Sequence, residues 1–267
     1  MDKKISILDI QEMKDKGEKI TMLTAYDYPT ARILDECGVE VLLIGDSVGN
    51  VMMGTENTLP VTTDEIIYHT EAVVRARKRA LVVADMPFMS YQVSVEQAKE
   101  EAGRLIKEGG AEAVKLEGGE NMEEVIKAIC GIDIPVMGHI GLTPQSVHRM
   151  GGYKVQGKEE KQREKLLADA LAVERTGAFS VVLEAVPLSL AKEITQTLNI
   201  PTIGIGAGIH CDGQVLVIHD ILGLAGKFRP KFVKQYADLE NEITKAVKKF
   251  LFEVKKKKFP TDKHSFH

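Results

Sequence analysis

The chain has 267 residues, of which 44% are hydrophobic and 28% are charged, and its formal net charge at pH 7 is −4. This composition is typical of a soluble globular protein that is long enough to bury a large core. The slight negative charge gives no general attraction to nucleic acid or to an anionic membrane, so we expect neither as a partner.

The amino-terminal segment and the cysteines indicate the cellular compartment. The segment MDKKISILDI has no long apolar stretch, so we expect no signal peptide or membrane span and, by default, a cytoplasmic location. Cys37, Cys130 and Cys211 are odd in number and far apart, which indicates reduced thiols. Cys211 follows His210, but the spacing of these residues fits no standard zinc site.

Short apolar runs recur along the whole chain, after a first predicted helix at residues 7–16 that we expect to plug the amino-terminal end of the fold. The runs are rich in Val, Ile and Leu, as in strands of a parallel sheet that is buried on both faces. The predicted strands cover residues 20–25, 39–45, 80–84, 111–116, 134–138, 179–183, 201–205 and 214–218.

Polar segments with helical periodicity separate most of these strands. Such alternation indicates right-handed βαβ units, and eight of them can close into a (β/α)8 TIM barrel whose active site lies at the carboxyl ends of the strands. No repeat or linker divides the chain, so we expect a single domain over residues 1–267. The predicted helices cover residues 63–78, 95–107, 122–129, 161–175, 188–198 and, near the end, 239–255.

Five potential catalytic or metal-binding residues close or directly follow predicted strands: Asp46, Asp85, Glu117, His139 and Glu184. In a barrel, these positions converge on one mouth. Helix capping is an alternative explanation for any single acidic residue. A cluster of carboxylates is harder to explain in this way, because unpaired carboxylates repel one another and usually need a cation or a shared proton.

The carboxylates of Asp46, Asp85 and Glu117 are hard oxygen donors, which favour Mg2+ over zinc. Mg2+ takes one or two protein carboxylates and leaves its other positions to water and to a substrate such as a 2-oxo acid. Lys115 precedes Glu117 by two residues, so both side chains should point to the same face of the strand. Lys115 could anchor a substrate carboxylate, or it could simply pair with Glu117.

Glu184 follows a strand roughly opposite these carboxylates, which makes it the candidate general base. A metal that polarises a 2-oxo group acidifies the adjacent C3 proton, and the base would remove that proton to give an enolate. His139 could assist proton movement or donate a hydrogen bond, and it could equally be a packing residue.

Six segments, taken in chain order, resemble the ketopantoate hydroxymethyltransferase family: GDSVGNVMMGTENTLPVT, ADMPFMSY, VKLEGG, GHIGLTPQSVHRMGGYKVQGK, LEAVP and GIGAGIHCDGQVLVIHD. The resemblance extends from about Ile20 to Phe232. It implies transfer of a one-carbon unit from 5,10-methylenetetrahydrofolate to 3-methyl-2-oxobutanoate, which yields ketopantoate on the pathway to pantothenate and coenzyme A.

The resemblance also implies roles for individual residues. Asp46 and Asp85 match the family's magnesium ligands and hold the substrate through the metal, while Glu117 matches a third magnesium residue that acts directly or through a metal-bound water. Ser47 and Lys115 match contacts to the substrate carboxylate.

In the same way, Glu184 matches the family's general base, and His139 matches a histidine near the substrate. The family further implies a homo-oligomer, expected to be a decamer, with small molecules as its other partners. A barrel of the phosphoenolpyruvate mutase or isocitrate lyase type is an alternative, but its KKCGH motif is absent. A non-catalytic barrel is a second alternative, for which loss of a site carboxylate would be the expected sign.

Overall fold

The computed structural model describes residues 3–152, 154–224, 226 and 230–267. Tyr153, inside one of the six segments, lies outside the described residues. The chain divides into two compact units, Met1–Val217 and Ile218–His267. The prediction that residues 1–267 form a single domain therefore stays a prediction, while the barrel itself belongs to the first unit.

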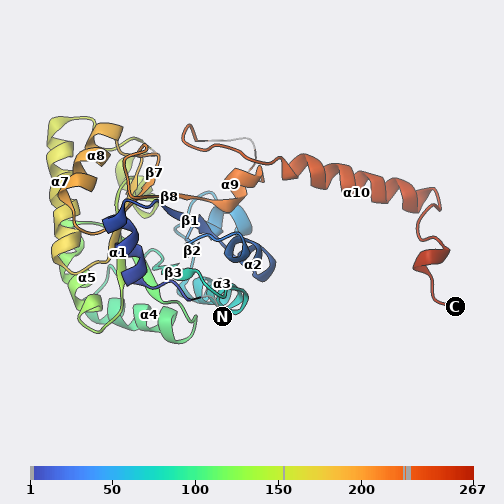
Figure 1. Ribbon diagram of the computed structural model, residues 1–267, viewed down its shortest axis with the longest axis horizontal. Helices are drawn as coiled ribbons and strands as arrows, with labels where there is room; N and C mark the ends of the chain where they lie inside the picture. Colours follow the sequence, from blue (N-terminus) through green and yellow to red (C-terminus); the bar gives the residue numbers. More distant parts are fainter. Residues whose placement is uncertain (1–2, 153, 225, 227–229) are drawn as a thin grey trace. The chain divides into compact units, whose positions relative to one another are not determined.

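Eight parallel strands close into a barrel in the first unit, in sequential order from β1 to β8 (Figure 1). Pairing of β1 with both β2 and β8 completes the ring. This topology confirms the predicted (β/α)8 TIM barrel. The strands are β1 (Ile20–Thr24), β2 (Val41–Ile44), β3 (Leu81–Asp85), β4 (Ala113–Glu117), β5 (Val136–Gly141), β6 (Ser180–Glu184), β7 (Thr202–Ile205) and β8 (Gly213–Leu216).

Helices precede the barrel and connect most of its strands. The helices of the first unit are α1 (Ile7–Lys16), α2 (Tyr28–Glu36), α3 (Thr63–Ala76), α4 (Val95–Lys107), α5 (Glu123–Cys130), α6 (Val147–Met150), α7 (Glu160–Arg175) and α8 (Leu188–Thr197). Three short helical turns accompany them: η1 (Gly49–Met53), η2 (Glu120–Met122) and η3 (Pro144–Ser146). The segment 206–212 between β7 and β8, which is fully described, contains no helix.

The second unit contains α9 (Ile218–Leu222), α10 (Leu239–Lys255) and the short turn η4 (Asp262–His264). The predicted helices at 7–16, 95–107 and 239–255 agree with α1, α4 and α10, and the other predicted helices differ by one or two residues at their ends. Within the described residues, every helix is too short or too polar to span a membrane.

Helix α2 is an element that the sequence pattern did not single out. Asp27 caps its first turn, because its side chain accepts a hydrogen bond from the Thr30 N–H at 2.9 Å. Pro29 occupies the first turn, where its missing N–H costs nothing. Asp27, the acidic residue after β1, therefore caps a helix, which is not the role of the acidic residues that follow the next strands.

Inward-facing residues at alternate strand positions form the core of the barrel. Ile10 of α1 is fully buried among them, so the first helix plugs the barrel as predicted. Burial of one such aliphatic side chain contributes roughly 1.5–3 kcal/mol. The core cluster consists of Ile10, Ile20, Met22, Val41, Leu43, Leu81, Val83, Ala113, Met137, Val182, Ile203 and Val215.

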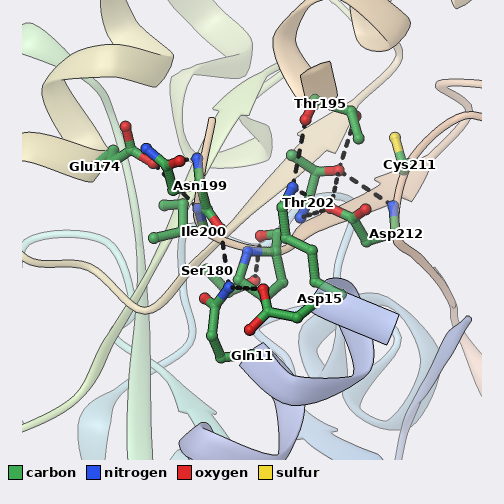
Figure 2. A network of polar contacts seen from close by, with 12 residues as sticks. Gln11, Asp15, Glu174, Ser180, Thr195, Asn199, Ile200, Thr202, Cys211 and Asp212 are labelled. Atoms are coloured by element: carbon green, nitrogen blue, oxygen red, sulfur yellow. Dashed lines mark hydrogen bonds and ion pairs between the residues drawn. The ribbon is translucent and has the colours of Figure 1, made fainter. Parts of the chain in front are cut away.

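Polar contacts tie α1 to the amino-terminal ends of the last strands (Figure 2). Oδ2 of Asp212 accepts hydrogen bonds from the Thr202 N–H and from Nζ of Lys14, each at 2.8 Å. Nε2 of Gln11 donates to the carbonyl of Asn199 at 3.0 Å. These contacts fix the helix against this end of the barrel and leave the opposite mouth to other residues.

Candidate active site

The inward positions of the strands change from apolar to charged toward their carboxyl ends. On β4, Ala113 belongs to the apolar core, whereas Lys115 and Glu117 follow it at two-residue intervals and so point to the same side. On β3, Asp85 follows the core residue Val83 in the same way. Strand pairing sets Asp85 beside Lys115, so the charges of neighbouring strands meet.

Strands β5 and β6 contribute the remaining predicted residues to the same end of the barrel. The strand register pairs Glu117 with His139, and Gly141 with Glu184. Ala185, directly after Glu184, has a φ of 49°, a left-handed conformation that is uncommon for a residue other than glycine. Its N–H nevertheless bonds to the Ile205 carbonyl at 2.8 Å, which holds the turn that presents Glu184.

Asp85 and Lys115 form a buried ion pair in which Oδ1 and Nζ are 2.7 Å apart. The Asp46 N–H donates to Oδ2 of Asp85 at 2.9 Å, which links the loop after β2 to β3. All three residues are almost completely buried. The ion-pair partner of Lys115 is therefore Asp85 rather than Glu117.

Ser47 lies beside this pair, in the loop after β2. Its Oγ is 2.7 Å from the hydroxyl of Tyr26. A Cβ placed on Gly45 would lie 2.8 Å from Oγ of Ser47 and 3.4 Å from Oδ2 of Asp85. Glycine at position 45 therefore permits the close approach of these polar atoms.

His139 contacts Lys115 on one side and Glu184 on the other. Its Nδ1 is 3.3 Å from Nζ of Lys115, and its Nε2 is 3.1 Å from Oε2 of Glu184. Burial, together with the charge of Lys115, holds the pKa of His139 well below its usual value, so the imidazole is neutral. Because the Lys115 ammonium can only donate, Nδ1 accepts and the ring proton is on Nε2, which makes no hydrogen bond within the described residues although Glu184 is close to it.

Burial raises the pKa values of the carboxyl groups at this mouth. The pKa of Asp85 is about 6, since Lys115 only partly offsets burial and the charge of Asp46 adds to it. Burial and Asp46 raise the pKa of Glu117 well above its usual value, and burial raises that of Glu184 to about 7 against the opposing charge of Lys115.

Lys115 itself stays charged. Burial opposes its charge, but the carboxylates of Asp85, Asp46 and Glu117 outweigh burial and raise its pKa. One lysine thus faces several carboxyl groups in a water-poor site. Such an excess of acidic groups favours a bound cation or retained protons.

Two further polar residues hold the carboxylates in place, and the sequence pattern did not point to either. Gln145 of η3 donates from Nε2 to Oδ2 of Asp46 at 3.0 Å and from its backbone N–H to Oε2 of Glu117 at 3.1 Å. The Tyr91 hydroxyl donates to Oε1 of Gln145 at 2.8 Å and accepts from the Glu117 N–H at 3.1 Å. Both lie after a strand, β3 or β5, and within two of the segments that carry the family resemblance, ADMPFMSY and GHIGLTPQSVHRMGGYKVQGK.

The donor set fits a hard divalent cation better than zinc. Oδ1 of Asp85 is buried and accepts no hydrogen bond, although the Lys115 ammonium is in contact with it. Among the described residues, no group of three or more His, Cys, Asp or Glu side chains is arranged to hold a metal. Asp46 and Asp85 together would suffice for Mg2+, which commonly uses one or two protein carboxylates.

The sequence matches the ketopantoate hydroxymethyltransferase family over residues 4–262. It is 65% identical, over 266 residues, to the 3-methyl-2-oxobutanoate hydroxymethyltransferase of Geobacter metallireducens (strain ATCC 53774 / DSM 7210 / GS-15). It is 64% identical to the protein of that name from Geobacter sulfurreducens (strain ATCC 51573 / DSM 12127 / PCA). In both alignments, 100% of this chain and 100% of the relative are covered.

Two solved structures with a similar barrel have much lower sequence identity to this chain. A phosphoenolpyruvate phosphomutase from Streptomyces platensis subsp. rosaceus superposes with a TM-score of 0.62 at 14% identity, covering 94% of this chain and 88% of its own. A 2,3-dimethylmalate lyase of the PEP mutase/isocitrate lyase superfamily also gives 0.62 at 14% identity, with coverage of 97% and 91%. These likenesses show a shared fold and no more.

Proposed function

The chain belongs to the ketopantoate hydroxymethyltransferase family, and from this premise we propose that it transfers a hydroxymethyl group from 5,10-methylenetetrahydrofolate to 3-methyl-2-oxobutanoate. The product is 2-dehydropantoate (ketopantoate), in pantothenate and coenzyme A biosynthesis. The observation that carries the proposal is 65% identity over the whole chain to a relative of that name.

Glu184 is the general base of the proposed reaction. Its pKa of about 7 lets it accept a proton near neutral pH, and Nε2 of His139 lies 3.1 Å from Oε2 of its carboxyl group. Glu184 takes the C3 proton of the 2-oxo acid, which leaves an enolate. The enolate carbon then bonds to the methylene carbon of the folate, both carbon–nitrogen bonds of that methylene break, and water supplies the hydroxyl oxygen of the product. Tetrahydrofolate leaves, its two nitrogens having taken up the proton held by Glu184 and one proton from water.

Lys115 and Ser47 orient the substrate by its carboxylate. The Lys115 ammonium is charged and buried, so an incoming carboxylate meets it in a water-poor environment where the attraction is strong. Asp46 and Asp85 would hold Mg2+, with Glu117 bound directly or through water, and the metal would polarise the 2-oxo group. Gln145 positions this set because it contacts both Asp46 and Glu117.

The proposal includes self-association into a homodecamer. It is supported by an exposed apolar face on α10 whose members recur at helical spacing. Light scattering after gel filtration should give the mass of ten chains of 29.4 kDa each, and a monomeric mass would contradict the proposal. The residues of this face are Ile243, Val247, Phe250, Leu251 and Val254.

A cytoplasmic location is also part of the proposal. Cys37, Cys130 and Cys211 are free thiols, which suits a reducing compartment. Localisation of a tagged full-length chain by cell fractionation would check it, and recovery outside the cytoplasm would contradict it.

The proposed reaction is tested by NMR of deuterium exchange at C3 of 3-methyl-2-oxobutanoate, with and without Mg2+, followed by addition of 5,10-methylenetetrahydrofolate. We expect metal-dependent exchange and then ketopantoate. Exchange without product would retain the enolate step but remove the folate as the donor. Absence of exchange with any divalent metal would refute the role of Glu184 and of the carboxylates.

A further inference from the structure

Tyr26 lies just after β1 and is almost completely buried. The Ala25 N–H bonds to the Leu43 carbonyl at 2.9 Å, which holds the segment after β1 against β2. Across this junction, the Tyr26 hydroxyl is 2.7 Å from Oγ of Ser47 in the loop after β2. The proposed reaction gives Ser47 a role in substrate binding and leaves its buried neighbour without one.

Helix α3 holds Tyr26 in place through His69. Nδ1 of His69 is 2.6 Å from the Tyr26 carbonyl, and because a carbonyl oxygen can only accept, Nδ1 carries the proton and donates it. The imidazole also meets the Tyr26 ring edge to face, with ring centroids 6.2 Å apart and 81° between the planes. The Tyr26 ring is therefore held in one orientation, with its hydroxyl against Ser47.

A substrate carboxylate fixes the direction of the hydrogen bond between the two hydroxyl groups. A carboxylate can only accept, so a Ser47 hydroxyl that contacts it donates its single proton to it. Oγ of Ser47 then accepts, and the Tyr26 hydroxyl is the donor beside it. Burial raises the pKa of Tyr26 above its usual value, so the phenol keeps the proton that it donates.

Thr24, the last residue of β1, extends this arrangement. Its side chain hydrogen-bonds to the same phenol, and since the Tyr26 proton goes to Ser47, the Thr24 hydroxyl donates and the phenol oxygen accepts. Three hydroxyl groups thus form a chain that ends at the substrate carboxylate. Hydrogen bonds in such a chain polarise and strengthen one another.

We propose that Tyr26 is a positioning residue for the 2-oxo acid: its hydroxyl donates to Oγ of Ser47 and thereby directs the Ser47 proton toward the substrate carboxylate. The inference rests on the proposed function, in which Ser47 and Lys115 bind that carboxylate. Ser47 is partly exposed and Tyr26 is not, so the substrate meets Ser47 and Tyr26 acts through it. Lys115 attracts the carboxylate by its charge, whereas the Tyr26–Ser47 pair sets its orientation, because a hydrogen bond is directional.

The test measures KM and kcat for C3–H exchange of 3-methyl-2-oxobutanoate with Mg2+, in the full-length wild type, Tyr26→Phe, Ser47→Ala and the double variant. Tyr26→Phe keeps the ring and removes only the hydroxyl. We expect it to raise KM about tenfold, the effect of weakening one charge-assisted hydrogen bond, with little change in kcat because Glu184 is untouched. Ser47→Ala should raise KM at least as much, and adding Tyr26→Phe to it should raise KM no further.

Tyr68→Phe is the matched control, because Tyr68 packs against the same His69, with ring centroids 5.3 Å apart, but is itself exposed. It should exchange C3–H with the KM and kcat of the wild type. An unchanged KM in Tyr26→Phe, or an equal rise with and without Ser47→Ala, would overturn the role of Tyr26 and leave the proposed reaction intact. A wild type that exchanges no C3–H with any divalent metal would refute the proposed function and this inference with it. Thermal unfolding followed by circular dichroism guards against loss of folding as the cause.

Discussion

The two ends of the barrel bury carboxylates in opposite electrostatic states. At the amino-terminal end, Asp35 accepts hydrogen bonds from the N–H groups of Lys78 and Ala80 at 2.7 Å each and from that of Arg79 at 3.1 Å. Burial alone would raise the pKa of Asp35, but these three donors outweigh it and lower the pKa. At the carboxyl end, burial raises the pKa of Glu184 to about 7.

The difference shows that hydrogen-bond donors, together with burial and neighbouring charges, set the pKa of a buried acid. A carboxylate that accepts hydrogen bonds from several backbone N–H groups stabilises the fold. A buried carboxyl group that lacks such N–H donors can instead exchange a proton or bind a cation.

The largest effect is expected from Glu184→Gln, which keeps the shape of the side chain but removes the base. C3–H exchange should fall about 10³-fold, within the usual range for loss of a general base, while binding of the 2-oxo acid changes little. NMR of deuterium exchange and calorimetry of substrate binding check the two parts.

The matched control is Glu174→Gln, at the amino-terminal end of the barrel. Glu174 accepts hydrogen bonds from the backbone of Asn199 and Ile200 (Figure 2). This variant should exchange C3–H at the wild-type rate and melt at a lower temperature. Equal loss of exchange in both variants would contradict the functional contrast between the two ends.

A smaller effect is expected from Gln145→Ala, because Gln145 acts through the carboxylates that it contacts. Loss of such a supporting contact typically costs about 10- to 100-fold in activity or metal affinity. We expect kcat to fall and the Mg2+ concentration for half-maximal exchange to rise, with little change in KM for the 2-oxo acid. If the Mg2+ concentration for half-maximal exchange did not change, Gln145 would have only a structural role.

The pH dependence of exchange should follow the raised pKa of Glu184. The base works only when deprotonated, so the rate should rise with pH through about 7, level off above that, and fall about tenfold per unit on the acid side. Exchange rates from pH 5 to 9, at saturating 2-oxo acid, measure this profile. A flat profile down to pH 5 would mean that the carboxyl group has an ordinary pKa.

The smallest effect on catalysis is expected from Asp35→Asn, which belongs to the amino-terminal end. We expect unchanged exchange but a loss of about 2 kcal/mol in the free energy of unfolding, because charged hydrogen bonds to three N–H groups are lost. The pKa of Asp35 is lowered by folding, so its contribution is complete above the unfolded pKa of about 3.9 and declines as the pH falls below it. Denaturant unfolding at pH 7 and pH 3 should therefore show a smaller difference from the wild type at the lower pH.

The strand positions of the candidate site could be predicted from the sequence, because two local patterns were enough. Continuous apolar runs mark buried parallel strands, and the two-residue period places Lys115 and Glu117 on one face. Asp85 and Glu184 stand at the ends of such runs and therefore had to lie at one end of any parallel barrel.

The contacts among these residues could not be predicted in the same way. Pairing of Lys115 with Asp85 depends on the register of β3 and β4, which places the two residues side by side. Gln145 reaches Asp46 across 99 positions of sequence, from a loop with no periodic signal. Helix α2, which is nine residues long, was not predicted because its capping residue Asp27 resembled the acidic residues after the other strands.

The barrel, its strand ends and the kind of chemistry available there follow from hydrophobic period and residue type, which are local properties of the chain. Which acid keeps its charge depends instead on the folded structure. Asp35 meets three backbone donors and ionises readily, whereas Glu184 meets a neutral histidine and holds its proton to about pH 7. Protonation depends on burial and on neighbours that come together from distant segments, and these are known only once the chain has folded.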